Sequence, residues 1–231
     1  MGKIVELNFK KNSLRKINNF LQNINYKSNK RDYTINNPNG QHAVCAGLKE
    51  DITVMIKGHV GYYCGGMNQR ANIIVDGNAG TGLGENMMSG TIHVKGNVSQ
   101  SAGATAHGGT IIVGGDASSR CGISMKGVDI IVKGSVGHMS GFMAQSGTIL
   151  VCKDAGEALG DSIYETIIYV AGKTKSLGAD CVEKKMNKTD IKKIESLLKK
   201  GNIKKLKPNN FKKFGSARKL YNFKVDNVSE Y

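Results

Sequence analysis

The chain has 231 residues, of which 30 are glycine, two are proline and none is tryptophan. Glycine is about twice as frequent as in an average protein, which predicts a fold with many tight corners or an internal repeat. No run of about 18 apolar residues occurs, which excludes a membrane-spanning helix, and the first residues lack the apolar core of a secretory signal.

The formal net charge of +15 is unevenly distributed along the chain. Residues 1–40 have a balance of +6 and residues 183–231 a balance of +10, whereas residues 41–182 have a balance of −1. Most basic residues are lysine, and arginine, which makes the bidentate contacts common in nucleic-acid recognition, is scarce. We therefore interpret the basic segments as solvated flanks and expect no nucleic-acid partner.

The N-terminal segment, residues 1–48, is expected to be a cap. Residues 13–24 predict a short amphipathic helix, because Leu14, Ile17, Leu21 and Ile24 recur at helical spacing. Such a helix can cover the open edge of a stack of strands.

Residues 49–182 contain an internal repeat. One glycine recurs every 19 residues, and Lys153 takes its place in one copy: Gly58, Gly77, Gly96, Gly115, Gly134 and Gly172. A second glycine follows seven residues later in six copies: Gly65, Gly84, Gly103, Gly122, Gly141 and Gly160. Both sets are predicted to be structural corner glycines.

An Ile/Val-x-Ile/Val pair precedes the first glycine of every copy, as in Ile92 and Val94 or Ile111 and Val113. This spacing of two is typical of a β-strand with both residues on one face. The residues six places after the glycine, such as Cys64 and Leu83, are also expected to point inward. We predict an all-β fold, a single-stranded right-handed parallel β-helix of seven 19-residue coils with α-helical caps at both ends.

Residues 183–231 are expected to form a C-terminal helix and tail. Thr189 is the predicted N-cap, Ile194, Leu197 and Leu198 form an apolar face with Ile191, and Gly201 ends the helix.

Residues that could support chemistry are scattered. The five cysteines (Cys45, Cys64, Cys121, Cys152 and Cys181) include no C-x-x-C pair, which is typical of reduced thiols in the cytoplasm. His59, His93, His107 and His138 fall at four different positions of the repeat. Asp76, Asp116 and Asp154 lie near corners, two coils apart, which leaves a sugar-cleaving activity as a minor alternative. We expect this chain to contribute no catalytic, cofactor-binding or metal-binding residue.

Apolar residues also occupy positions expected to face outward. Three places before the first glycine, the copies read Met55, Ile74, His93, Ile112, Ile131, Leu150 and Tyr169. Either a flank of the chain or another protein is expected to cover this outer ladder. Methionine-rich and aromatic corners extend the candidate partner interface, which comprises Tyr62, Tyr63, Asn86, Met87, Met88, Met125, His138, Met139, Phe142 and Met143.

Several segments resemble the GXGXG β-helix domain, including GHVGYYCGGMNQ (58–69), GNAGTGLGENMMSG (77–90) and DAGEALGDSIYE (154–165). This domain forms the C-terminal part of the large subunit of glutamate synthase. It also occurs as a separate polypeptide, as in N-methylglutamate synthase, whose stand-alone β-helix subunit the segment GSARKLYNFKVDN (215–227) resembles.

The resemblance implies a non-catalytic structural subunit that joins two partners. One is a class II glutamine amidotransferase subunit, and the other is a glutamate synthase-like subunit that carries FMN and an iron–sulfur cluster. The resemblance to the β-helix subunit of formylmethanofuran dehydrogenase is more distant, and that type of complex or an independent β-helix scaffold remains the alternative.

Overall fold

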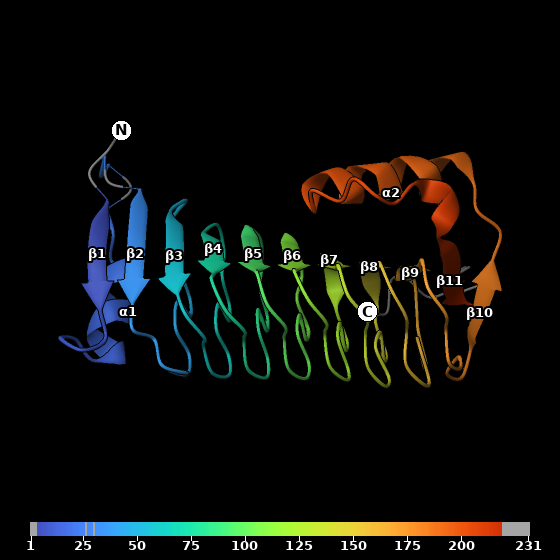
Figure 1. Ribbon diagram of the computed structural model, residues 1–231, viewed down its shortest axis with the longest axis horizontal. Coiled ribbons are helices and arrows are strands. Elements are labelled where there is room, and N and C mark those ends of the chain that lie inside the picture. Colours follow the sequence, from blue (N-terminus) through green and yellow to red (C-terminus); the bar gives the residue numbers. More distant parts are fainter. Residues whose placement is uncertain (1–3, 26, 30, 219–231) are drawn as a thin grey trace, which may run out of the picture.

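The computed structural model describes residues 4–25, 27–29 and 31–218. Its strands form one 11-stranded sheet in the order β1-β2-β3-β4-β5-β6-β7-β8-β9-β11-β10. Figure 1 shows them side by side along the long axis. The strands are β1 (Val5–Asn8), β2 (Asp32–Asn36), β3 (Thr53–Lys57), β4 (Asn72–Val75), β5 (Thr91–Val94), β6 (Thr110–Val113), β7 (Lys126–Val132), β8 (Ser146–Val151), β9 (Ile167–Val170), β10 (Cys181–Lys184) and β11 (Lys212–Ser216). The helices are α1 (Leu14–Gln22), α2 (Lys188–Lys200) and a 3₁₀ turn, η1 (Pro208–Asn210).

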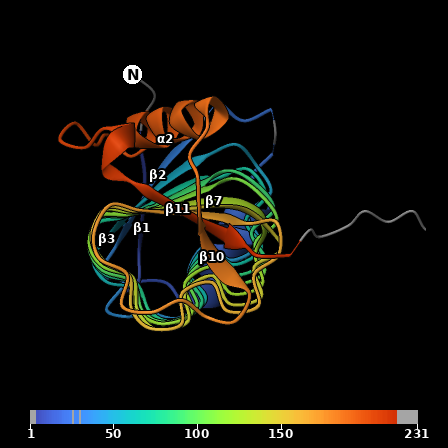
Figure 2. The ribbon, with the colours of Figure 1, turned by 90° about the vertical axis from the view of Figure 1, so that its right-hand side faces the viewer.

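Strands β1 to β9 pair in parallel, each with the next. From β3 to β9 the paired residues are equivalent positions of the repeat, as in Ile73 with Ile92 and Ile92 with Ile111. Figure 2 shows the coils superposed end on, with α2 against one side. The predicted all-β parallel solenoid of about seven turns is therefore confirmed.

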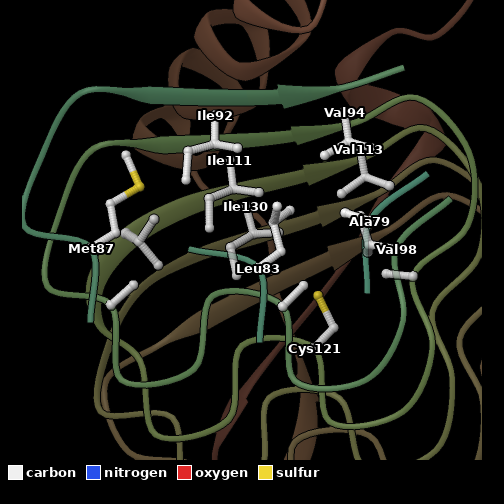
Figure 3. Close-up of a cluster of buried hydrophobic side chains, with 14 of the residues drawn as sticks. Ala79, Leu83, Met87, Ile92, Val94, Val98, Ile111, Val113, Cys121 and Ile130 are labelled. Atoms are coloured by element: carbon white, nitrogen blue, oxygen red, sulfur yellow. The ribbon is translucent and has the colours of Figure 1, made fainter. Parts of the chain in front are cut away.

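The interior of the solenoid is filled by stacked aliphatic side chains. Ile92, Ile111 and Ile130 form one ladder, in which every member is 0% exposed (Figure 3). The positions six places after the first glycine, such as Leu83, are also buried, as predicted, and Ala79, two places after it, is buried as well. Burial of such ladders is the main favourable contribution to the folding of a stack whose coils contact only their neighbours.

The second glycine column adopts a left-handed backbone against this interior. At Gly103 φ is +70°, and a β-carbon there would lie 2.6 Å from Cδ1 of Ile130 on β7. Residues two places before and after the glycines of this column, such as Arg120 and Ser124 around Gly122, also have positive φ, and with the exception of Gly82 they are not glycine. The inward contact, rather than the backbone angle alone, therefore demands glycine at this position.

The first glycine column makes room for a hydrogen-bonded ladder at one corner. In successive coils a side chain accepts the backbone N–H of the equivalent residue in the next coil: Asn78 Oδ1 from Asn97 (2.8 Å), Asn97 Oδ1 from Asp116 (2.8 Å) and Asp116 Oδ1 from Ser135 (2.8 Å). A β-carbon on Gly115 or Gly134 would collide with the accepting oxygen.

Lys153 interrupts the glycine column at the coil where a serine replaces the asparagine or aspartate acceptor of this ladder. The acceptor beside it is the short Ser135 side chain, whose Oγ accepts the Asp154 N–H at 3.3 Å. The backbone contacts of the corner persist, because Lys153 N–H donates to Gly134 O and Lys153 O accepts from Gly172 N–H. A small acceptor at position 135 explains how the corner accommodates a lysine.

The N-terminal segment covers the first coil. Ser13 caps α1 by accepting the Lys16 N–H, and Ile17 and Leu21 are 1% exposed, which confirms the predicted helix. Strand β2 already pairs with β3, so the sheet begins before residue 49. The boundaries at residues 48 and 182 remain predictions.

The C-terminal segment covers the other end and part of the outer sheet face. Helix α2 forms as predicted and its C-cap is Gly201, but the predicted N-cap Thr189 was wrong. Asn187 caps the helix instead, because its Oδ1 accepts the N–H groups of Thr189 and Asp190. Strand β11, which the sequence analysis missed, lies antiparallel between β9 and β10. The remainder of the predicted tail, residues 219–231, lies outside the described residues.

A buried polar cluster fastens α2 to the solenoid. Tyr169 of β9 donates its hydroxyl to Asp190 Oδ1 at 2.6 Å, and the Lys213 ammonium lies 2.8 Å from the same carboxylate oxygen. Burial alone would raise the pKa of Asp190, but the hydrogen bonds from Lys213, Tyr169 and the Asn187 N–H outweigh it and lower that pKa. The cluster joins three segments that are distant in the sequence.

Candidate interaction surfaces

The cysteine side chains are unsuited to nucleophilic chemistry. All five are free, and Cys45, Cys64, Cys121 and Cys181 are buried. Burial raises the pKa of Cys64 and Cys121 to about 12 and the pKa of Cys152 and Cys181 to about 11. Thiols with such pKa values are almost fully protonated at neutral pH.

The histidines lie apart, and two of them have structural contacts. His59 Nδ1 accepts the Asn78 N–H at 2.9 Å and thereby starts the corner ladder. His42 Nδ1 accepts the Tyr62 N–H, and the two rings stack with centroids 4.0 Å apart. Within residues 4–25, 27–29 and 31–218, no three His, Cys, Asp or Glu side chains gather as a metal ion would require.

Two of the carboxylates considered for sugar cleavage belong to the corner ladder. Asp116 Oδ1 accepts the Ser135 N–H, and Asp154 Oδ1 accepts the Lys173 N–H at 2.7 Å. The third, Asp76, forms an exposed ion pair with Lys95. These contacts give all three acids a local structural role.

The ten candidate interface residues divide into three groups. Tyr62, Met88 and Met143 are 54%, 49% and 42% exposed, and His138 is also exposed. Four more are half-buried: Tyr63, Asn86, Met139 and Phe142.

The expectation that Met87 and Met125 lie at the surface was wrong, because both are 0% exposed. They belong to an inward column in which methionine alternates with Ala106 and Ala144, so that large and small side chains interdigitate between coils. This alternation at a spacing of 19 is visible in the sequence and could have placed them inside. Met67, which is 48% exposed, was missed and adds a further exposed apolar residue to this set.

Helix α2 covers only part of the outer ladder. Ile112, Ile131, Leu150 and Tyr169 pack against it in a second hydrophobic cluster. Met55, Ile74 and His93, on β3, β4 and β5, are half-buried, and α2 ends before these strands (Figure 1). The flank therefore accounts for four rungs of this ladder and leaves three accessible.

No helix among the described residues has the length and apolarity needed to span a bilayer. The longer of the two α-helices, α2, has 13 residues.

Comparison with known proteins identifies relatives of this solenoid. The GXGXG motif family model matches residues 14–225. The chain is 58% identical over 218 residues to Protein GlxC of Rhizobium meliloti (strain 1021), an alignment that covers 94% of this chain and 96% of that protein. The matched region includes both glycine columns and both helices, and the chain belongs to the GXGXG motif family.

Proposed function

We propose that this chain is a non-catalytic structural subunit of a glutamate synthase-like complex. In this complex it joins a class II glutamine amidotransferase subunit to an FMN-containing synthase subunit. FMN and an iron–sulfur cluster belong to the synthase subunit, and this chain binds neither. The expected location is the cytoplasm.

The observation that carries the proposal is the placement of side chains inside and outside the coils. The inner face of every coil is packed with aliphatic side chains, and the corner carboxylates accept backbone hydrogen bonds. The accessible apolar residues lie instead on outer surfaces, at Tyr62, Met88 and Met143. Exposed apolar and methionine side chains are typical of surfaces that contact other proteins.

The finer features of the architecture belong to the same proposal. Residues 1–48 act as the N-terminal cap, residues 49–182 as the β-helix and residues 183–231 as the C-terminal helix and tail. The coils wind right-handedly, as parallel crossover connections nearly always do.

Co-purification from the native host tests the proposed assembly. A tagged full chain should recover one subunit with glutaminase activity and one flavoprotein in fixed ratio. The double variant Tyr62→Ala/Met88→Ala should recover less of at least one partner, because it removes accessible apolar surface. The matched control Lys188→Ala/Lys192→Ala changes two exposed residues of α2 and should recover both. Recovery of the wild-type chain as a single species without these partners contradicts the proposal.

The same experiment separates the alternatives. Recovery of the other subunits of a formylmethanofuran dehydrogenase-type enzyme favours that alternative. Filaments of the purified chain in electron microscopy favour an independent scaffold that associates through its end coils.

A further inference from the structure

A pocket of about 630 Å³ lies between the carboxyl ends of β7 and β8 and the segment that follows α2. Its apolar part is formed by Cys152, Ile203 and Leu206, which pack against the second hydrophobic cluster. The volume falls within the range of about 300–1,000 Å³ that is usual for small-molecule sites.

Four lysines line this pocket: Lys133, Lys153, Lys204 and Lys205. Among the described residues, none of the four has a carboxylate within ion-pair distance. Four nearby lysines of α2 and β11 differ in this respect, because each of the four pairs with an acid. Lys193 and Lys200 pair with Asp129, Lys212 pairs with Glu183, and Lys213 pairs with Asp190. The pocket therefore concentrates positive charge that the chain leaves uncompensated.

Neighbouring titratable groups respond to this charge. Burial lowers the pKa of His93, and the charges of Lys133 and Lys95 lower it further. At Cys152 burial raises the pKa to about 11, against an opposing effect of Lys133. Both responses indicate a positive potential at this edge of the sheet.

Lys153 enters the pocket from the one corner where the glycine column is interrupted. From Gly77 onward, the other corners of this column exclude a side chain, because a β-carbon would meet the ladder oxygen of the preceding coil or its backbone. Only Ser135, with its short side chain, leaves room. The exception to the repeat thus adds a fourth lysine to the lining of the pocket.

We infer that this pocket binds a phosphorylated small molecule. The phosphate groups lie among the four lysine ammonium groups, and the apolar or aromatic part of the ligand rests on Cys152, Ile203 and Leu206. Lysine provides compact charges suited to phosphate, and four lysines lining one pocket favour a multiply charged anion over a single carboxylate. This inference does not depend on the identity of the partner subunits.

Cys152 provides a site-specific reporter, because the four other cysteines are buried. The purified full chain is treated with a maleimide at about pH 9, where a thiol with a raised pKa still reacts slowly. ATP and inorganic pyrophosphate serve as probes, with adenosine as the uncharged comparison. ATP and pyrophosphate should slow labelling of Cys152 at least about threefold and should do so less as salt increases, because salt screens the lysines. Adenosine should have little effect.

Variants of the pocket lysines test whether ATP binds in this pocket. Lys153→Gly restores the usual corner residue, and Lys204→Gln/Lys205→Gln removes two charges from an exposed loop, so both should fold normally. Each should weaken ATP binding in calorimetry by about tenfold. The control Lys188→Gln/Lys192→Gln removes the same charge from exposed positions of α2 and should leave the affinity unchanged.

Three outcomes overturn the inference. ATP and pyrophosphate could leave the labelling rate unchanged, or the control could weaken binding as much as the pocket variants do, which indicates a diffuse charge effect. In the third, only a co-purified protein protects Cys152, which assigns the pocket to a protein contact.

Discussion

The inner and outer faces of the β3–β9 sheet are built by different means. On the inner face every rung is an aliphatic residue that is 0% exposed, from Val54 to Ile168. On the outer face only the rungs from β6 to β9 are buried, and a segment outside the repeat buries them. The coil closes over its own inner face, whereas its outer face depends on whatever packs there. A repeat of this kind therefore specifies its interior and leaves its exterior available for contacts.

The largest effect is expected where a side chain intrudes on the inner face. Gly103→Ala should lower the free energy of unfolding by about 2–5 kcal/mol, because it combines a left-handed backbone with overpacking against Ile130. Denaturant unfolding of purified protein measures this change.

Gly82→Ala is the matched control for that substitution. Gly82 has the same φ of +70°, but its β-carbon would approach only the mobile carboxylate of Glu85. Its cost should be about 1–2 kcal/mol, from the backbone conformation alone. Equal losses at Gly82 and Gly103 contradict the argument that the inward contact selects glycine.

On the outer face, the loss of unfolding free energy on substitution should depend on whether α2 covers the substituted residue. Leu150→Ala should lower the free energy of unfolding by about 2–5 kcal/mol, because Leu150 is 0% exposed beneath α2. Ile74→Ala, at the equivalent position on β4, should cost only about 1 kcal/mol in the isolated chain, because Ile74 remains partly exposed. Denaturant unfolding of both variants gives the comparison, and similar losses would show that the outer face is uniformly buried.

The sequence predicted the inner face well because its period is regular. Equivalent positions repeat at a fixed spacing, so the stacking of Ile92 on Ile111 follows from the chain alone. Helix α2 was recognisable from its apolar spacing, but nothing local indicated which rungs it would cover. Strand β11 was missed because Lys212–Ser216 lacks an alternating apolar pattern and pairs only through its position between β9 and β10.

The candidate surfaces were predicted less well than the interior. Whether a residue faces outward depends on its position within the 19-residue repeat, and not on its residue type. Met87 and Met125 were assigned to the surface by residue type, although their column alternates methionine with alanine in the interior. The basic pocket was missed for another reason. It joins the ends of β7 and β8 to residues 202–206, and no repeat relates these segments.

The smallest change in the free energy of unfolding is expected at the corner that contains Ser135 and Lys153. Ser135→Asn should lower the free energy of unfolding by about 1 kcal/mol, because the longer side chain would meet the β-carbon of Lys153. Lys153→Gly alone should change it by less than about 1 kcal/mol. Combined, the two substitutions recreate the arrangement of Asn97 beside Gly115, and the asparagine gains its hydrogen bond. Denaturant unfolding of the single and double variants should therefore show a favourable coupling of about 1 kcal/mol. Strict additivity would mean that Ser135 does not make room for Lys153, and the lysine would then need another explanation.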